Sequence, residues 1–453
     1  MKIGIEAHIQ LSTLSKIFCS CPTSGSENPN TLTCPTCLGL PGSKPVLNKE
    51  ALHQAIKVAL ALNCSMPTET FFSRKNYFFP DLPKSYQISQ YEIPIGINGK
   101  LENIRMRRIH LEEDPGALIH KGNTTLIDYN RSGIPLIEIV TEPDFKSPNE
   151  VRLFLRKLIT ILEYLSIYTR KSEATMKADA NISTTGEKVE IKNITGLKEI
   201  ERALEYEAAR QKKEPAEQQE TRGWNSEKGI TFLQRTKEEE SDYGYIFDSD
   251  LPKIEISKSL QEEIKKQIPE LFLEKVSRFK TQYKLQAEDA ETLAAEKELA
   301  ELFEQVATNI DPLLAAKWLR RDLMKVLHYN KKELKEIKID AMHIIELLTL
   351  VKERKINDAT AKELLIKLIE KPFSPREQVK KHSLEMLSSE TEIEDMCKEV
   401  IKNNKSVVED YKKGKQEALH YLIGQVMRLS KGKADPKETE KILKRLLQKT
   451  VVS

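Results

Sequence analysis

Four cysteines near the N-terminus have the spacing of a metal site. Cys19 and Cys21 form a Cys-x-Cys pair, and Cys34 and Cys37 form a Cys-x-x-Cys pair twelve residues further on. Four thiolates can surround one tetrahedral Zn²⁺ and leave no position for water or substrate. We therefore expect a structural zinc site. The alternative is free or redox-active thiols, which rarely cluster so tightly in a reducing compartment.

Carboxylates and imidazoles gather in two other segments. Glu6 and His8 stand two residues apart, and residues 107–116 bring His110 and three acids together before a turn. Clustered carboxylates repel one another unless cations hold them, and such ligands suit Mg²⁺, which also bridges to phosphate. Surface ion pairs with the neighbouring arginines explain the same residues equally well.

A phosphate site in this chain cannot be formed by either of the common glycine-rich phosphate-binding motifs. The sequence contains neither a Walker A motif nor G-x-G-x-x-G. Any ATP site must then be built from side chains, and residues 74–84 offer Arg74, Lys75 and Lys84 interleaved with aromatics such as Tyr77. A packed β segment with basic ends is the alternative.

A strand and a hairpin are expected to position these groups. Residues 3–11 alternate between an apolar face and a polar face that carries Glu6 and His8, which is typical of a half-buried strand. Residues 176–183 and 187–193 alternate on either side of a turn at Gly186. Asp179 lies on one strand of this hairpin and Glu190 on the other.

Helix signals dominate the later part of the chain. Asn48 caps an expected helix over 49–63, and Ser147-Pro148 opens one that runs to Leu165. Asp311-Pro312 opens another that runs to Leu327, and two prolines within 371–375 predict a linker. We therefore expect an α+β protein with a β-rich domain containing helices (1–290), an all-α helical domain (291–373) and a small α-helical tail domain (374–453).

Composition narrows the function further. The chain has 453 residues, enough for about three domains, and no apolar run approaches the roughly 18 residues of a membrane span. Glu6 interrupts what would be the apolar part of a signal peptide, so we expect a cytoplasmic protein. Residues 401–453 carry a net charge of +7, against −4 for the first 400. This basic tail fits either nucleic-acid binding or a solvated helical surface.

The ordered motifs resemble one family. They include residues 4–8, 34–42, 74–77, 86–90, 110–116, 128–133, 135–140, 179–181, 192–193, 424–427 and 432–436. This series is similar to the B subunit of the three-subunit aspartyl/glutamyl-tRNA amidotransferase, in its zinc-containing, archaeal-like type. The short stretch between the β-rich domain and the helices favours B over the related E subunit. One departure is Gly244, in the loop 241–245, where the family usually has an arginine.

The resemblance implies an enzyme. Its N-terminal cradle domain would bind ATP and Mg²⁺ and phosphorylate the side-chain carboxylate of mischarged Asp-tRNA(Asn) or Glu-tRNA(Gln). Ammonia released from glutamine by an A subunit would then displace the phosphate, so the heterotrimer, completed by a small C subunit, is a ligase that forms C–N bonds. The tail would hold the tRNA.

The resemblance also implies roles for individual residues. The catalytic residues would be Glu6, His8, Glu113, Asp179 and Glu190, and all of these except Asp179 would hold Mg²⁺. Lys75, Tyr77 and Lys84 would line the ammonia channel or contact substrate. The competing hypothesis is a zinc-stabilised tRNA-binding scaffold whose catalytic site has decayed, and the intact acids favour the enzyme.

Overall fold

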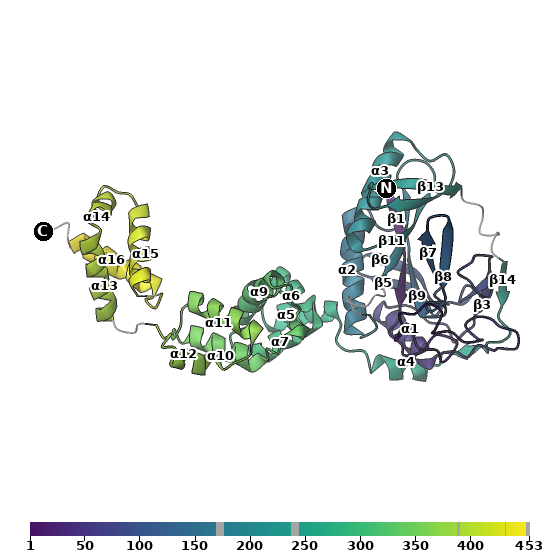
Figure 1. Ribbon diagram of the computed structural model, residues 1–453, viewed down its shortest axis with the longest axis horizontal. Helices are drawn as coiled ribbons and strands as arrows, with labels where there is room; N and C mark the ends of the chain where they lie inside the picture. Colours follow the sequence, from purple (N-terminus) through teal and green to yellow (C-terminus); the bar gives the residue numbers. More distant parts are fainter. Residues whose placement is uncertain (169–175, 237–243, 387–389, 431, 450–453) are drawn as a thin grey trace. The chain divides into compact units, whose positions relative to one another are not determined.

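The protein is described by a computed structural model that covers residues 1–168, 176–236, 244–386, 390–430 and 432–449. It divides into two compact units, Met1–Phe272 and Leu273–Ser453 (Figure 1). The first unit contains the sheets and the second is helical. The sequence placed the end of the first domain at residue 290, whereas residues 273–290 lie in the second unit, where they form most of α5 and the start of α6.

An eleven-stranded sheet forms the first unit, in the order β13-β12-β11-β10-β1-β9-β6-β4-β3-β14 with β5 beside β6. Its strands are β1 (Lys2–Gln10), β3 (Ser73–Asn76), β4 (Tyr86–Ser89), β5 (Gly96–Leu101), β6 (Ile104–Glu113), β9 (Pro135–Thr141), β10 (Lys177–Ser183), β11 (Val189–Thr195), β12 (Glu220–Asn225), β13 (Ile230–Thr236) and β14 (Gly244–Phe247). Two small ribbons pair β2 (Glu69–Thr70) with β15 (Ile254–Glu255) and β7 (Ala117–Lys121) with β8 (Thr124–Asp128). Strands that carry the acids are therefore near the centre of the sheet.

The period-2 pattern of the N-terminus is confirmed by β1. Ile3, Ile5 and Ile9 are fully buried, or nearly so, on one face, while Glu6 and His8 are half-buried on the other. β10 and β11 form the predicted antiparallel hairpin, and β1 pairs antiparallel with both β10 and β9. The polar faces of β1 and the hairpin are thus continuous.

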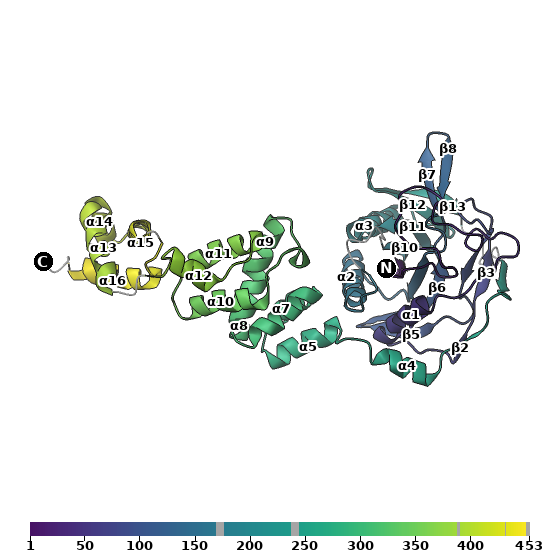
Figure 2. The same ribbon diagram turned by 60° about the horizontal axis from the view of Figure 1, so that its bottom comes forward.

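Among its described residues the first unit has four helices: α1 (Lys49–Ala61), α2 (Pro148–Tyr164), α3 (Leu197–Lys213) and α4 (Lys258–Lys265). The predicted caps are confirmed, since the Asn48 side chain accepts from the N–H of Glu50 and the Ser147 side chain from that of Glu150. α1 packs against β5 and β6, and α3 packs against β10, β11 and α2 (Figure 2). The helices leave the polar face of the central strands open.

The second unit consists of helices α5 (Phe272–Gln282), α6 (Ala287–Ala294), α7 (Lys297–Ala307), α8 (Pro312–Lys317), α9 (Met324–Tyr329), α10 (Ala341–Lys352), α11 (Asp358–Glu370), α12 (Pro375–Lys381), α13 (Glu390–Asn403), α14 (Lys405–Lys412), α15 (Glu417–Leu429) and α16 (Pro436–Lys449). A π-helical segment, Trp318–Leu323, joins α8 to α9. No helix within the described ranges is both long and apolar enough to cross a membrane.

The expected linker at 371–375 is a short break between α11 and α12. α12 packs against α10, whereas a separate hydrophobic core that includes Ile393, Leu422 and Val426 begins with α13. The predicted limit of the tail at residue 374 therefore precedes the first residue of that core. Residues 241–243 of the loop that departs from the family lie outside the described ranges.

Candidate functional site

Three rows of residues cross the central sheet, and all of them except Val140 line a cavity of about 640 Å³ on its polar face. The pairing of β10, β1, β9, β6 and β4 brings together residues that are far apart in the sequence. The first row is Asp179, Glu6, Val140 and Arg108; the second is Lys177, His8, Glu138 and His110; the third is Gln10, Leu136, Glu112 and Ser89. Strand register thus produces one site from five strands.

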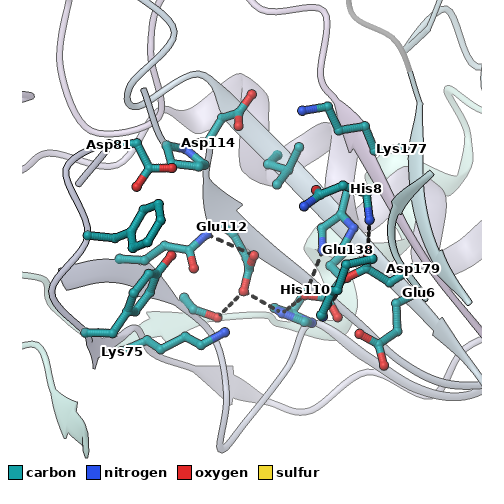
Figure 3. Close-up of a pocket in the computed structure, with 18 of the residues that line it drawn as sticks. Glu6, His8, Lys75, Asp81, His110, Glu112, Asp114, Glu138, Lys177 and Asp179 are labelled. Carbon is teal, nitrogen blue, oxygen red and sulfur yellow. Dashed lines mark hydrogen bonds and ion pairs between the residues drawn. The ribbon is translucent and has the colours of Figure 1, made fainter. Parts of the chain in front are cut away.

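The second and third rows meet in a buried cluster of two imidazoles and two carboxylates. Glu138 Oε2 lies 3.2 Å from His110 Nε2 and 3.6 Å from His8 Nε2. Glu112 Oε1 lies 3.1 Å from the same His110 nitrogen and accepts a 2.8 Å hydrogen bond from Ser89 Oγ. Figure 3 shows the two histidines and the two glutamates converging.

The carboxylates control protonation of this cluster. Burial by itself lowers the pKa of both histidines, but the hydrogen bonds and charges of the glutamates outweigh it and raise the pKa of His8 and of His110 to about 9. Burial raises the pKa of Glu138, yet His110 and His8 together hold it well below its usual range. In the absence of another cation, the histidines therefore balance the buried acids.

A second cluster contains Glu6, Asp179 and Glu190, with ligand oxygens that lie within 4.8 Å of one another. Lys192 donates to Asp179 Oδ2 at 2.7 Å and also pairs with Glu190. Burial is the main cause that raises the pKa of Glu6, which accepts a 3.0 Å hydrogen bond from Asn181 Nδ2. The hairpin thus supplies Asp179 and Glu190 to the same place as Glu6.

Glu113 is placed differently from the other predicted acids. Successive side chains of a strand point to opposite faces, so Glu112 enters the cavity and Glu113 does not. Its carboxylate pairs with Lys84, which is also outside this cavity, and accepts a 2.8 Å hydrogen bond from the Ile88 N–H. The structure therefore separates Glu113 and Lys84 from Glu6, His8, Asp179 and Glu190.

Two residues predicted to contact channel or substrate, Lys75 and Tyr77, do line the cavity. Tyr245, one residue after the departure at Gly244, lines it as well. A Cβ added at Gly244 would meet only the Asn76 side chain, at 3.9 Å, so the fold does not require glycine there.

The predicted cysteine cluster is assembled. The sulfur atoms of Cys19, Cys21, Cys34 and Cys37 lie within 4.8 Å of one another. The hydrogen bond with Cys19 lowers the pKa of Cys37 to about 5, and the charge of Lys16 acts in the same direction. Four converging thiols of which one readily ionises are a donor set that can bind a metal.

Sequence reasoning assigned no role to several residues of the site. His110 and Glu112 stood within the acidic segment but outside the assigned ligands, and Glu138 lies in β9, where every residue is buried. A single carboxylate in a strand of mainly apolar residues was the available signal for Glu138. Its importance depends on two neighbouring strands, which only the pairing reveals.

Buried polar atoms without partners indicate that this site takes a ligand. Among the described residues, His110 Nδ1 and Asn181 Oδ1 are buried and make no hydrogen bond. The first belongs to the imidazole cluster itself, and Asn181 stands beside the three acids, where its amide donates to Glu6. Oxygen-rich clusters with residual negative charge suit a hard divalent cation such as Mg²⁺.

Comparisons with known proteins give the family. Residues 1–262 match the GatB/GatE catalytic domain and residues 301–447 match the GatB domain. The B subunit of the aspartyl/glutamyl-tRNA(Asn/Gln) amidotransferase from Methanothermobacter thermautotrophicus is 45% identical, over 98% of this chain and 99% of the relative. Proteins of the same name are 43% identical in Caldanaerobacter subterraneus subsp. tengcongensis, over 99% of both chains, and in Thermotoga maritima, over 98% of both. The chain therefore belongs to the family of aspartyl/glutamyl-tRNA(Asn/Gln) amidotransferase B subunits.

Proposed function

We propose that the cavity on the central sheet is where ATP phosphorylates the side-chain carboxylate of mischarged Asp-tRNA(Asn), Glu-tRNA(Gln) or both. As a B subunit, the chain serves tRNA-dependent transamidation within a glutamine-dependent ligase. The observation that carries the proposal is the three cross-strand rows, which place acids, imidazoles and cations on one cavity floor.

The chemistry requires activation because a carboxylate is a poor acyl donor. Its oxygen is a poor leaving group, and its charge repels nucleophiles. Transfer of a phosphoryl group to the carboxylate removes both obstacles, and ammonia from the glutaminase A subunit can then displace phosphate to give Asn-tRNA(Asn) or Gln-tRNA(Gln). Bound Mg²⁺ would neutralise phosphate charge during phosphoryl transfer.

We assign the metal to two groups of residues that line the cavity or, in the case of Glu190, adjoin it. His8, Glu112 and Glu138 form one candidate ligand set, and Glu6, Asp179 and Glu190 form the other. His110 positions the first set through Glu112 and Glu138, and Lys192 holds two acids of the second. In this proposal Glu112 replaces Glu113 among the ligands predicted from the sequence, because Glu113 is paired with Lys84 on the other face.

We further propose that the four cysteines bind structural Zn²⁺, since all four thiols converge and leave no open coordination position. Metal analysis of protein purified without chelator tests this, and a chain with no bound metal would refute it. We expect A and C subunits as partners, and the basic tail as a contact for the tRNA body. Because the substrate is tRNA, we place the complex in the cytoplasm.

The test of the phosphorylation site compares a glutamate of the cavity with an exposed glutamate outside it. In the assembled complex with ATP and each mischarged tRNA, Glu112→Gln should slow the formation of phosphorylated aminoacyl-tRNA by about 100-fold or more, because it removes the negative charge of a candidate metal ligand. Glu69→Gln is the matched control, since Glu69 is exposed and pairs with Lys253 outside the cavity.

The outcomes are distinct. A wild-type complex that forms no phosphorylated intermediate would refute the proposed reaction. A Glu112→Gln variant as fast as Glu69→Gln, together with a slow Glu113→Gln variant, would instead show that the wrong face of β6 was assigned to the metal.

A further inference from the structure

One guanidinium lines the cavity without a carboxylate partner. Within the described residues Arg108 forms no ion pair, and its Nε is buried without any hydrogen bond. Its neighbours on β6 are different, since Arg105 pairs with Asp144 and Arg107 with Glu142, each through two nitrogens. A buried donor without an acceptor is costly in free energy, and surface ion pairs, which account for Arg105 and Arg107, do not account for Arg108.

A β-bulge directs Arg108 into the cavity. Pairing between β6 and β9 shifts by one residue between Met106 and Arg108. Met106 is fully buried, as is Ile109, whereas Arg108 lines the cavity together with His110 and Glu112. With regular alternation, Arg108 would share the face of Met106. Bulges of this kind re-aim side chains beside functional sites.

Aromatic contacts hold the guanidinium in place. Its central carbon lies 5.5 Å from the ring centroid of Tyr91, and Tyr91 stacks on Tyr245 with ring centroids 3.9 Å apart. This cation–π contact involves the positive charge of the guanidinium but gives its N–H groups no hydrogen-bond acceptor. Those donors remain for a ligand.

The position of Arg108 suits an extended anion. Arg108 shares a cross-strand row with Glu6 and Asp179, and one strand, β9, separates it from Glu6, so the two residues are two strand spacings apart. Neighbouring strands lie about 4.8 Å apart, so the Cα atoms of Arg108 and Glu6 are roughly 10 Å apart. A polyphosphate can span such a distance, with one end at the acids and their cation and the other at the guanidinium.

We propose that Arg108 is a phosphate-binding residue for the nucleotide in this cavity, an inference that rests on the proposed phosphorylation reaction. A planar guanidinium matches two phosphate oxygens with two parallel N–H bonds, and its charge offsets the carboxylates that would otherwise repel ATP. The other phosphate source in the reaction is the sugar-phosphate chain of the tRNA, which the test separates from ATP.

The test uses the assembled complex and three variants. Arg108→Met removes the charge and keeps an apolar side chain against Tyr91, and Arg108→Lys keeps the charge without the fork. Arg107→Met is the matched control, because Arg107 is the adjacent residue and pairs with Glu142 outside the cavity. Calorimetric titration measures the Kd of ATP with Mg²⁺, and filter binding measures the Kd of the tRNA.

Arg108→Met should weaken ATP binding on the order of 10- to 100-fold, the range expected when a charged hydrogen-bonding partner is lost. Arg108→Lys should recover part of this loss, and Arg107→Met should bind ATP as wild type does. tRNA affinity should be the same in all of them. The Arg108→Lys comparison remains informative if the Met variant folds poorly.

Equal ATP affinity in Arg108→Met, Arg108→Lys and Arg107→Met would overturn the inference. A loss of tRNA affinity with normal ATP affinity would also overturn it, because the phosphate would then be that of the tRNA. If Arg108→Met loses ATP affinity but the wild type forms no phosphorylated aminoacyl-tRNA, the phosphate-binding role stands and the proposed reaction fails.

Discussion

Lys16 gives the sharpest test of the cysteine site, because it is a fully buried cation beside the thiols. It is 0% exposed, and its Nζ lies 3.9 Å from Cys37 Sγ and donates to the Tyr129 carbonyl at 3.2 Å. A Zn²⁺ ion with four thiolates carries a net charge of −2. Lys16 therefore offsets charge that the protein interior would otherwise hold unbalanced.

Replacement of Lys16 by Met keeps the length of the side chain and removes only the charge. Two unit charges about 4 Å apart interact by about 4 kcal/mol at the effective dielectric constant typical of proteins. We expect between half and all of this interaction to appear in metal affinity, so Lys16→Met should weaken zinc binding roughly 30- to 1,000-fold.

Competition with a chromophoric chelator measures this change in the full-length protein. Lys44→Met is the control, since Lys44 is an exposed lysine a few residues beyond Cys37. The difference between the variants should persist at 1 M salt, because buried charges are screened little. Equal zinc affinity in the two variants, or a difference that high salt abolishes, would refute the charge-balance argument.

Three perturbations test the fold away from the metal sites. Ser147→Ala removes the cap of the Glu150 N–H and should cost about 1 kcal/mol, seen as a lower calorimetric midpoint for the first unit; an unchanged midpoint would contradict the cap. Leu422 is fully buried in the core of the tail, so Leu422→Ala should destabilise the tail by about 2–5 kcal/mol and weaken tRNA binding while ATP affinity is unchanged. A variant that binds tRNA as tightly as the wild type would show that the tail does not contact the RNA. Burial raises the pKa of Cys64 to about 12 and of Cys397 to about 11, so iodoacetamide should alkylate both slowly at pH 8, and rapid labelling there would contradict their burial. The pKa of each thiol is higher in the folded protein than in the unfolded chain. The contribution of the two thiols to stability is therefore complete below the unfolded pKa and declines as pH rises toward the folded pKa.

Local signals were enough to predict much of the fold. The caps at Asn48 and Ser147, the alternation of β1 and the hairpin at Gly186 depend on residues close in sequence, and the structure confirms all four. The helix opened by Asp311 begins as predicted, but it continues through a π-helical segment to Tyr329 rather than ending at Leu327. Apolar spacing did not reveal that change in hydrogen bonding.

The composition of the site could not be predicted completely, because it depends on strand pairing. Glu138 gains its role only when β1 and β6 bring His8 and His110 to either side of it. Likewise, the choice between Glu112 and Glu113 depends on the bulge that follows Met106, which reverses the faces of the rest of β6. No spacing within residues 107–116 indicates that reversal.

Glu112 and Glu113, at the end of β6, also connect this strand to β4, so a loss of activity after their substitution can have two causes. Within the described part of the chain, one residue pair, Ser89 and Glu112, links β4 to β6 through the backbone register. Side chains strengthen the contact, since Glu112 accepts from Ser89 and Gln87, and Glu113 accepts from the Ile88 N–H. An alanine at either position would therefore loosen this part of the sheet and reduce activity whichever residue holds the metal. Glutamine keeps an oxygen acceptor and removes the negative charge, so the Gln variants separate a metal ligand from a link between strands.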